Sequence, residues 1–331
     1  MSMIERVIAK AKSDVKTIVF PEGNEERTIL AAEILKKEGI AKPILLGDPE
    51  DVLGTASKLG ADLAGIMIED PLSGSRCTAY ADALFEIRKN KGVTLDEAEK
   101  LVLDPMYYGI MMVKMGDADG LVSGAVHTTG DMLRPALQII KTKPEMKIVS
   151  SSFLMDCPDK SLGEDGLLVY ADCVVMPCPP AEELAYIAIA AADTAKRLCG
   201  FEEPRVAMLS FSTKGSAKHE SVSKVQNAVQ IAHELAPDLL LDGEMQFDAA
   251  LVPEIGASKA KGSPVAGRAN VLIFPDLQAG NIGYKITQRI GKADCFAVLQ
   301  GLNKPCNDLS RGCTALDIVH TAAMTAVQAQ S

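Results

Sequence analysis

The stretch KTIVFPEGNEERTILAAEILKKEG, residues 16–39, contains the three parts of an α/β unit. KTIVF is typical of a short buried strand, PEGN of a turn, and the remainder of an amphipathic helix. One face of that helix is apolar and consists of Leu30, Ala31, Ile34 and Leu35. Gly39 marks its expected end. The stretch therefore predicts a strand that leads through a loop into the N-terminus of a helix.

The same alternation recurs along the chain. Further strands are predicted at KPILLG, AGIMIED, GLVSGA, KIVSSSFLM, GLLVYADCVVM, RVAMLSFS, DLLLDGE, NVLIFPD and DCFAVLQG. Helical patterns separate most of them, including one near residues 75–90 and one that opens with a capping box at Thr94–Glu97. This order favours an α/β fold with a mostly parallel sheet. Residues 150–177 break the pattern and predict an antiparallel hairpin or arm.

Length and charge restrict the possible functions. The 331 residues suffice for about two domains, and a domain change is predicted near residues 141–146. The net charge of −10 argues against nucleic acid or an anionic membrane as the main partner. Residues 1–14 predict an amphipathic helix and not a signal peptide. The eight Cys form no C-x-x-C pair, which favours a reduced, cytoplasmic protein without a zinc site.

The loop in DGLVSGAVHTTGDMLRPAL, residues 119–137, has the chemistry of an anion site. Its strand leads into a loop with hydroxyls and glycines, and Arg134 follows early in the next helix. These groups suit a phosphate, although a capped helix with a surface Arg is the alternative. His127 is interpreted as a hydrogen-bonded structural residue.

Two other loops offer weaker signals. MLSFSTKGSAKHE, residues 208–220, resembles a phosphate cradle but lacks P-loop spacing. An ordinary capping loop explains it equally well. In FPDLQAGNIGYKITQRIG, residues 274–291, the glycines allow either a close ligand or a simple turn.

The stretch NDLSRGCTALDIV, residues 307–319, runs from a loop into a helix. A helix that starts near Ser310 would place Ser310, Cys313 or Thr314, and Asp317 on one face. Ser310 and Asp317 would then be about 10 Å apart along the axis, which is room for one small ligand. The alternative has Ser310 as the N-cap, Arg311 in solvent and Asp317 in a surface ion pair.

Four blocks in this order and spacing resemble the phosphate acetyltransferase family: PEGNEERTILAA, DGLVSGAVHTTGDMLRPAL, FPDLQAGNIGYK and NDLSRGCTALDIV. The resemblance covers the chain from about Lys16 to its end. It implies reversible acetyl transfer between acetyl phosphate and coenzyme A (CoA), with inorganic phosphate as the other product. CoA is then a co-substrate, and no metal or tightly bound cofactor is needed.

The resemblance also implies a cytoplasmic homodimer active in acetate metabolism. Each subunit is expected to have two α/β/α domains with a cleft between them, in a fold related to isocitrate and isopropylmalate dehydrogenases. Because the C-terminal segment returns to the first domain in that fold, we expect domain I at 1–142 plus 296–331 and domain II at 143–295.

Residue by residue, the family's catalytic Ser–Arg pair falls on Ser310 and Arg311, and its catalytic Asp on Asp317. Two other functional arginines fall on Arg88, in FEIRKNKG, and on Arg134. We expect phosphate and CoA to be bound by Arg134, Arg88, Thr128, Thr129, Ser123 and Gly124. Asp317 is expected to accept the CoA thiol proton while the thiolate attacks the acetyl carbonyl, with Arg311 and Ser310 stabilising the developing charge.

Several alternatives stay open. A free Asp carboxyl and a thiol differ by about 4.6 pKa units, roughly 6 kcal/mol, so Asp317 could instead orient Ser310 or Arg311. An acetyl-enzyme on Cys313 lacks a nearby His partner. Phosphate butyryl transfer and non-catalytic acetyl-CoA sensing are the other functional alternatives. A dehydrogenase is disfavoured because the chain has neither a convincing G-x-G-x-x-G nor an acidic metal cluster.

Overall fold

The computed structural model describes residues 1–330. The chain forms two compact units. Unit 1 consists of Met1–Lys143 together with the C-terminal segment from Leu302, and unit 2 consists of Pro144–Gly301. The fold is mixed α/β, as predicted.

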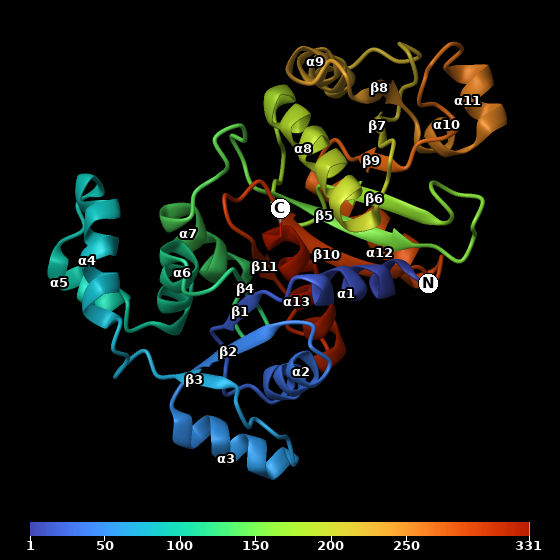
Figure 1. Cartoon of the computed structure of the whole chain (residues 1–331). Helices are drawn as coiled ribbons and strands as arrows, with labels where there is room; N and C mark the ends of the chain where they lie inside the picture. Colours follow the sequence, from blue (N-terminus) through green and yellow to red (C-terminus); the bar gives the residue numbers. More distant parts are fainter. Residues whose placement is uncertain (331) are drawn as a thin grey trace. The chain divides into compact units, whose positions relative to one another are not determined.

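Unit 1 is built on a five-stranded, all-parallel sheet in the order β11-β4-β1-β2-β3 (Figure 1). The strands are β1 Thr17–Phe20, β2 Lys42–Leu46, β3 Met67–Glu69, β4 Gly120–Ser123 and β11 Cys306–Asp308. The central strands β1 and β4 are almost fully buried. Parallel strands with both faces covered are apolar throughout, which explains why TIVF and GLVS read as short uninterrupted apolar runs.

Helices cover both faces of the unit 1 sheet. The helices are α1 Met3–Ser13, α2 Glu26–Lys37, α3 Pro49–Leu59, α4 Cys77–Arg88, α5 Leu95–Leu101, α6 Pro105–Met115, α7 Thr129–Ile139 and α13 Ala315–Ala329, with a short 3-10 turn η1 at Lys89–Lys91. α13 packs with α1 and α2 and touches β1 and β4, whereas α6 packs with α4 and α7 and touches the same two strands. The two groups therefore lie on opposite faces.

Local sequence signals fix several of the helix ends. The predicted capping box at Thr94 is confirmed: its side chain accepts from the Glu97 N–H while Glu97 bonds back to the Thr94 N–H. Ser2 and Glu5 form the same motif at the start of α1. The predicted strand and helix within residues 16–39 are confirmed as β1 and α2, with Ala31 and Leu35 fully buried.

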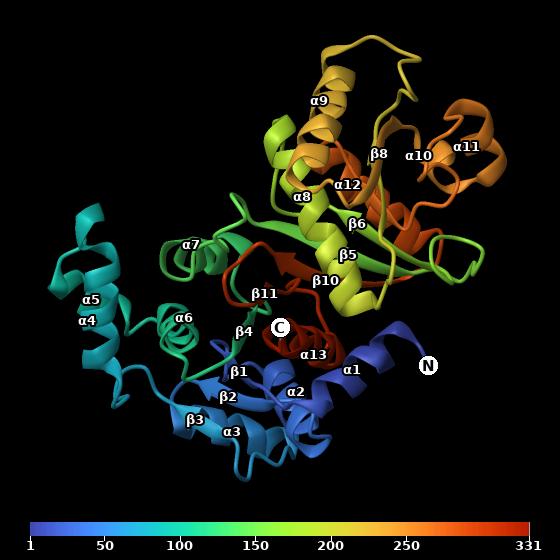
Figure 2. The same cartoon turned by 45° about the horizontal axis from the view of Figure 1, so that its top comes forward.

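Unit 2 carries a six-stranded mixed sheet in the order β10-β5-β6-β9-β7-β8 (Figure 1). Figure 2 shows its strands β10, β5, β6 and β8 from a second direction. The strands are β5 Ser150–Asp156, β6 Leu167–Ala171, β7 Arg205–Leu209, β8 Leu240–Met245, β9 Val271–Ile273 and β10 Asp294–Gln300. The helices are α8 Ala181–Thr194, which continues into a π turn η2 at Ala195–Cys199, α9 Glu220–Leu235, α10 Phe247–Leu251, α11 Pro253–Lys259 and α12 Leu277–Arg289. β5 and β6 pair antiparallel, which confirms the predicted hairpin.

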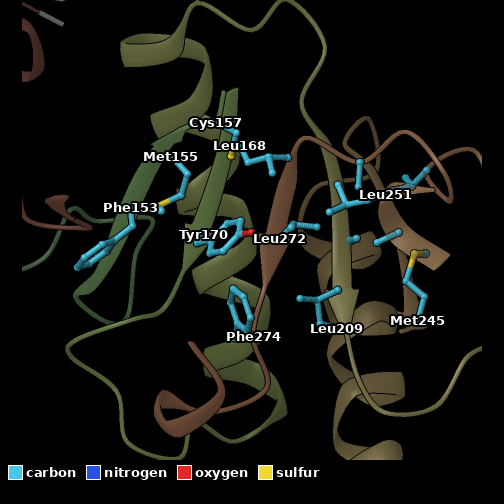
Figure 3. Packing of buried hydrophobic residues seen from close by; sticks show 14 of the residues in the cluster. Phe153, Met155, Cys157, Leu168, Tyr170, Leu209, Met245, Leu251, Leu272 and Phe274 are labelled. Carbon is cyan, nitrogen blue, oxygen red and sulfur yellow. The ribbon is translucent and has the colours of Figure 1, made fainter. Parts of the chain in front are cut away.

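The core of unit 2 comes from alternate residues of its strands (Figure 3). Phe153 and Met155 of β5 lie on the same face as Leu168 and Tyr170 of β6, as the two-residue strand period requires. The Tyr170 ring lies 5.2 Å from that of Phe274, centroid to centroid.

One expected boundary differs from the structure. The division predicted between residues 295 and 296 falls inside β10, which pairs with β5 along all seven of its residues. Residues 296–301 therefore belong to unit 2. This pairing joins residues about 140 positions apart in the chain, so no local sequence pattern predicts it.

Candidate functional site

The loops after β4 and β11 lie side by side because these strands are parallel neighbours. Ser123 ends β4 and is the register partner of Asp308, which ends β11. The Leu309 N–H continues the pairing by donating to the Ser123 carbonyl at 2.8 Å. Gly124 follows with a φ of 116°, and a Cβ there would lie 2.5 Å from the Leu309 nitrogen. Only glycine allows the two loops to approach so closely.

A buried carboxylate, Glu22, organises the loop after β4. It accepts hydrogen bonds from four consecutive N–H groups: Gly124 at 3.1 Å, Ala125 and Val126 at 2.9 Å, and His127 at 2.8 Å. The His127 Nδ1 lies 2.8 Å from the same carboxylate, which places that ring in the structural role predicted for it. Burial favours the neutral acid, but these hydrogen bonds outweigh burial and lower the pKa of Glu22.

The Glu22 carboxylate accepts hydrogen bonds from the backbone N–H groups that could otherwise bind an anionic ligand. Successive N–H groups form a concavity suited to phosphate, and here the protein fills it itself. The N–H groups of residues 124–127 are therefore already engaged and do not serve a phosphate at this loop. Gly124 gives its N–H to Glu22, and Ser123 is only 1% exposed. The predicted binding of phosphate or CoA by these two residues stays a prediction.

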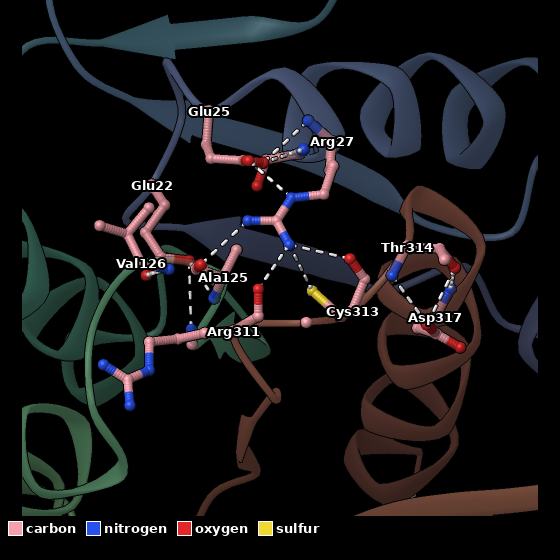
Figure 4. Close-up of polar contacts among 12 residues, drawn as sticks. Glu22, Glu25, Arg27, Ala125, Val126, Arg311, Cys313, Thr314 and Asp317 are labelled. Atoms are coloured by element: carbon pink, nitrogen blue, oxygen red, sulfur yellow. Dashed lines mark hydrogen bonds and ion pairs between the residues drawn. The ribbon is translucent and has the colours of Figure 1, made fainter.

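Arg27, from the first turn of α2, joins the two loops (Figure 4). Its Nη2 donates to the Ala125 carbonyl at 3.0 Å, in the loop after β4. Its Nη1 donates to the Arg311 and Cys313 carbonyls, both at 2.8 Å, in the loop after β11. Its Nε pairs with Glu25 at 2.6 Å. One guanidinium thus fixes the backbone on both sides of the candidate site.

Glu22 and Arg27 are not among the predicted site residues, although both stand in the block PEGNEERTILAA. Their partners lie about 100 and 280 residues further along the chain. The available signal is chemical: a Glu in the short loop after a buried strand and an Arg in the first turn of the next helix, at the end of the sheet where ligands gather in α/β folds.

The segment Ser310–Arg311–Gly312 is an exposed turn and not the start of a helix. The Cys313 N–H donates to the Ser310 carbonyl at 2.9 Å, and α13 begins only at Ala315, with Thr314 as N-cap. The prediction of a helix starting near Ser310, with Ser310 and Asp317 on one face, is therefore wrong. Ser310 is likewise not the N-cap that the alternative required.

Asp317 takes part in a capping box with Thr314. Its Oδ2 accepts from the Thr314 N–H at 2.7 Å and from the Thr314 hydroxyl at 2.9 Å. Figure 4 shows the Arg311 side chain extending away from α13 while Asp317 stays beside Thr314. The structure therefore places both residues at the same loop–helix junction without bringing their charged groups into contact.

The first turn of α7 carries the predicted hydroxyls. Thr128 is its N-cap, and both its N–H and its hydroxyl hydrogen go to Asp131. Thr129 instead bonds across to the carboxyl of Asp308, which links α7 to the end of β11. Arg134 is exposed further along the same helix. The structure thus joins Thr129 to the loop of Ser310 and Arg311, and Arg134 projects from the adjoining helix.

Arg88 occupies a different position. It ends α4, a helix that packs against α6 and α7. The Arg88 Nε is buried, and this nitrogen has no hydrogen-bond partner within residues 1–330. No hydrogen bond or ion pair within residues 1–330 joins Arg88 to the loops after β4 or β11, so its predicted role rests on the resemblance alone.

The two weaker loops of unit 2 have structural roles. In residues 208–220, the Glu244 carboxylate accepts from the Ser212 hydroxyl and the Gly215 N–H. A carboxylate of the protein therefore occupies the donors that gave this loop its resemblance to a phosphate cradle. In residues 274–291, a Cβ on Gly280 would lie 2.2 Å from the Asp172 carbonyl oxygen. Gly280 therefore serves close packing.

Within residues 1–330, no group of three or more His, Cys, Asp or Glu side chains is placed to hold a metal ion. Across the same residues, no helix combines the length and apolar character needed to cross a membrane.

The sequence profile described as phosphate acetyl/butaryl transferase matches residues 2–326. The chain belongs to this family. The phosphate acetyltransferase of Thermoanaerobacterium thermosaccharolyticum is 57% identical over 331 residues, which is the full length of both chains. Membership confirms the predicted enzyme class, an acyltransferase.

Solved structures agree with this family assignment. A phosphotransacetylase from Streptococcus pyogenes superposes with a TM-score of 0.94 at 50% identity, covering 100% of this chain and 99% of that one. A 4-hydroxythreonine-4-phosphate dehydrogenase from Klebsiella pneumoniae reaches a TM-score of 0.55 at 10% identity, covering 96% and 98%. The second match concerns the fold alone, and it confirms the predicted relation of this transferase fold to dehydrogenases.

Proposed function

We propose that the chain transfers an acetyl group reversibly between acetyl phosphate and CoA, releasing or consuming inorganic phosphate. The proposal is supported by full-length similarity to a phosphate acetyltransferase. The structural observation that supports this function most is that Arg27 bonds to carbonyls of two loops. It thereby holds the Ser310–Arg311 turn next to the loop that leads into α7. That junction gathers cationic and hydroxyl side chains at one sheet edge of an acidic protein.

Arg311 and Ser310 would act on the acyl phosphate. The Arg311 backbone is fixed by Arg27, whereas its guanidinium has no hydrogen bond or ion pair within residues 1–330 and is exposed. It can therefore pair with a phosphoryl or carbonyl oxygen. The Ser310 Oγ accepts from the Gly312 N–H at 3.3 Å, which leaves its own hydrogen for a ligand.

The phosphoryl group would be held chiefly by Arg311, Arg134 and Thr129. Thr128 is engaged in its capping box, so we give it, with Ser123 and Gly124, the role of fixing the loop. Arg88 would hold phosphate or a phosphate of CoA. This division assigns binding to side chains because Glu22 already occupies the backbone N–H groups.

Asp317 would accept the thiol proton of CoA. Its carboxylate lies apart from the Arg311 guanidinium (Figure 4). This separation fits a role for Asp317 at the CoA thiol and a role for Arg311 at the acyl phosphate. Transfer to an ordinary carboxylate is uphill by about 6 kcal/mol, so we place it in concert with formation of the carbon–sulfur bond. The carbon–oxygen bond to phosphate then breaks, and phosphate leaves.

A Cys313 acetyl-enzyme is the less favoured route. The side chain is only 8% exposed. Burial raises the pKa of the Cys313 thiol, although the nearby Arg27 opposes the shift. A buried protonated thiol is a poor nucleophile.

The direct test is formation of thioester from acetyl phosphate and CoA by the purified chain, with EDTA present. We expect turnover proportional to enzyme concentration and undiminished by the chelator. Binding of acetyl-CoA without turnover would support a sensing module instead. Faster transfer from butyryl phosphate than from acetyl phosphate would support phosphate butyryl transfer.

We further propose that the enzyme is a cytoplasmic homodimer that serves acetate metabolism. All eight Cys are free thiols, which fits a reducing compartment. The dimer rests on the family resemblance. Its measurement is the solution mass by light scattering, where about twice 35.1 kDa is expected.

Replacing Asp317 with Asn should lower kcat by about 100-fold with little change in either KM, because a general base contributes 10²–10⁴. The matched control is Thr314→Ala, which breaks the same capping box from its other side and leaves the carboxylate in place. Steady-state kinetics of both variants distinguish a general-base role of Asp317 from its role in capping α13. Equal losses of kcat would show that Asp317 acts only as a cap.

Replacing Arg27 with Lys should lower kcat at least tenfold and destabilise the fold by about 1–2 kcal/mol. Lysine keeps the charge, but its single ammonium cannot reach carbonyls of both loops and Glu25 together. Thermal unfolding and kcat are to be measured side by side. Lys12→Met, which removes an exposed pair with Glu38, is the control and should change neither. An Arg27→Lys variant with wild-type kcat would contradict the role of Arg27 in holding the Arg311 turn.

A further inference from the structure

Asp308 at the end of β11 is a carboxyl group that the proposed mechanism does not use. One of its oxygens, Oδ2, accepts a hydrogen bond from the Thr129 hydroxyl. The other, Oδ1, is buried and has no hydrogen-bond partner within residues 1–330. The hydroxyl of its register partner Ser123 is buried and unpaired in the same way. No Lys or Arg forms an ion pair with Asp308 in this part of the chain.

A buried carboxylate without a cation is costly, and the protein responds by holding its proton more tightly. Burial is the main cause that raises the pKa of Asp308, to about 6; the negative charge of Glu22 acts in the same direction, whereas the Thr129 hydroxyl and the Leu309 N–H lower the pKa. A shift in this direction brings protonation of Asp308 closer to neutral pH.

Other charged groups stand on the elements packed around β11. The charge of Glu22, which is bonded to His127, acts on Asp308 directly. The remaining groups are exposed or bonded elsewhere: Asp131 and Arg134 on α7, Asp317 on α13, and Arg27 and Arg311 at the loop.

The Thr129 hydroxyl has one hydrogen, so the state of Asp308 decides where that hydrogen points. When Asp308 is ionised, its carboxylate accepts the Thr129 hydrogen, and Thr129 can offer only lone pairs to a ligand. When Asp308 is protonated, it donates to the Thr129 oxygen, and the Thr129 hydrogen is released. The second arrangement suits a phosphoryl oxygen, and the first repels it.

We propose that Asp308 is a positioning residue that acts through Thr129 and makes binding of the phosphoryl substrate, acetyl phosphate or inorganic phosphate, depend on pH. This inference rests on the proposed function, because it takes the ligand of Thr129 to be the phosphoryl group. Phosphoryl affinity is high while Asp308 is protonated and falls as pH rises and the carboxyl ionises. The charge of Asp308 is not expected to change the affinity for CoA.

The test compares wild type with Asp308→Asn from pH 5 to 8. The Asn amide carries no charge and can donate an N–H to the Thr129 oxygen, so this variant mimics the protonated state. We measure the dissociation constant of inorganic phosphate by calorimetry and the KM values for acetyl phosphate and CoA. The ratio of wild-type to variant values cancels titration of the ligand itself. We expect this ratio to rise about tenfold between pH 5 and 8 for both phosphoryl ligands and to stay flat for CoA.

Two Thr129 variants complete the design. Thr129→Ser keeps the hydroxyl and should keep the pH-dependent ratio. Thr129→Val removes the hydroxyl and should abolish the difference between Asp308 and its Asn replacement. A flat phosphate ratio, or an unchanged ratio in the Thr129→Val background, would overturn the inference. A wild-type protein that binds phosphate with the expected pH dependence yet forms no thioester would overturn the proposed function and leave the positioning role standing.

Discussion

Replacing Arg311 with Ala is expected to lower kcat/KM for acetyl phosphate by about 10³. The guanidinium is the exposed cation of the Ser310–Arg311–Gly312 turn, and its backbone is clamped by Arg27. Loss of one preorganised donor at developing charge costs about 3–4 kcal/mol in other enzymes. The loss should appear mainly in kcat, because the interaction strengthens as charge builds on the departing phosphate.

Two variants sharpen this test. Arg311→Lys keeps the charge but not the planar fork, so it should recover only part of the rate. Arg289→Ala removes an exposed Arg in the last turn of α12 and should leave the rate unchanged. Initial rates of thioester formation at saturating CoA provide the readout. An Arg311→Ala enzyme within threefold of wild type would contradict the assignment.

Replacing Glu22 with Gln is expected to destabilise the protein by about 3 kcal/mol and to remove most activity. The carboxylate accepts from four backbone N–H groups and from His127. A Gln amide turns its NH₂ against some of these donors, which are then buried without partners at about 1–3 kcal/mol each. The loop after β4 should lose its shape, and Thr129 should move from its place.

The effect of Glu22 on stability has a definite pH dependence. The folded-state pKa of Glu22 is lowered, so the unfolded state binds its proton first as pH falls. The contribution is therefore fully present above the ordinary value of 4.5 and is lost as pH falls below it. Urea unfolding of wild type and Glu22→Gln should differ most at pH 7 and converge below pH 4. A pH-independent difference would contradict the role of the ionised carboxylate.

The sequence predicted elements whose signals are local. β1 and α2 were predicted because an apolar run, a Pro–Gly turn and an amphipathic helix follow within 24 residues. The error at Ser310 had a local cause as well. Thr314-x-x-Asp317 is itself a capping pattern, which places the helix start at Ala315, five residues later than predicted.

Other features had no local signal. Whether Glu22 fills the concavity at Gly124–His127 depends on β1 and β4 being neighbours in the sheet. Whether Asp308 meets Thr129 depends on β4 and β11 being neighbours, although 179 residues separate the two side chains. A sequence read segment by segment cannot show which carboxylate occupies which loop. It could indicate only that Glu22 and Asp308 stand at strand ends, where ligands bind.

The most direct test of the central claim is phosphate exchange without CoA. Purified enzyme is incubated with acetyl phosphate and isotopically labelled inorganic phosphate, and label in acetyl phosphate is measured before and after CoA is added. Direct passage of the acetyl group from phosphate to the thiol predicts no labelled acetyl phosphate until CoA is present, and rapid labelling afterwards. Labelling in the absence of CoA would demonstrate an acetyl-enzyme and contradict direct transfer at the Ser310–Arg311 turn.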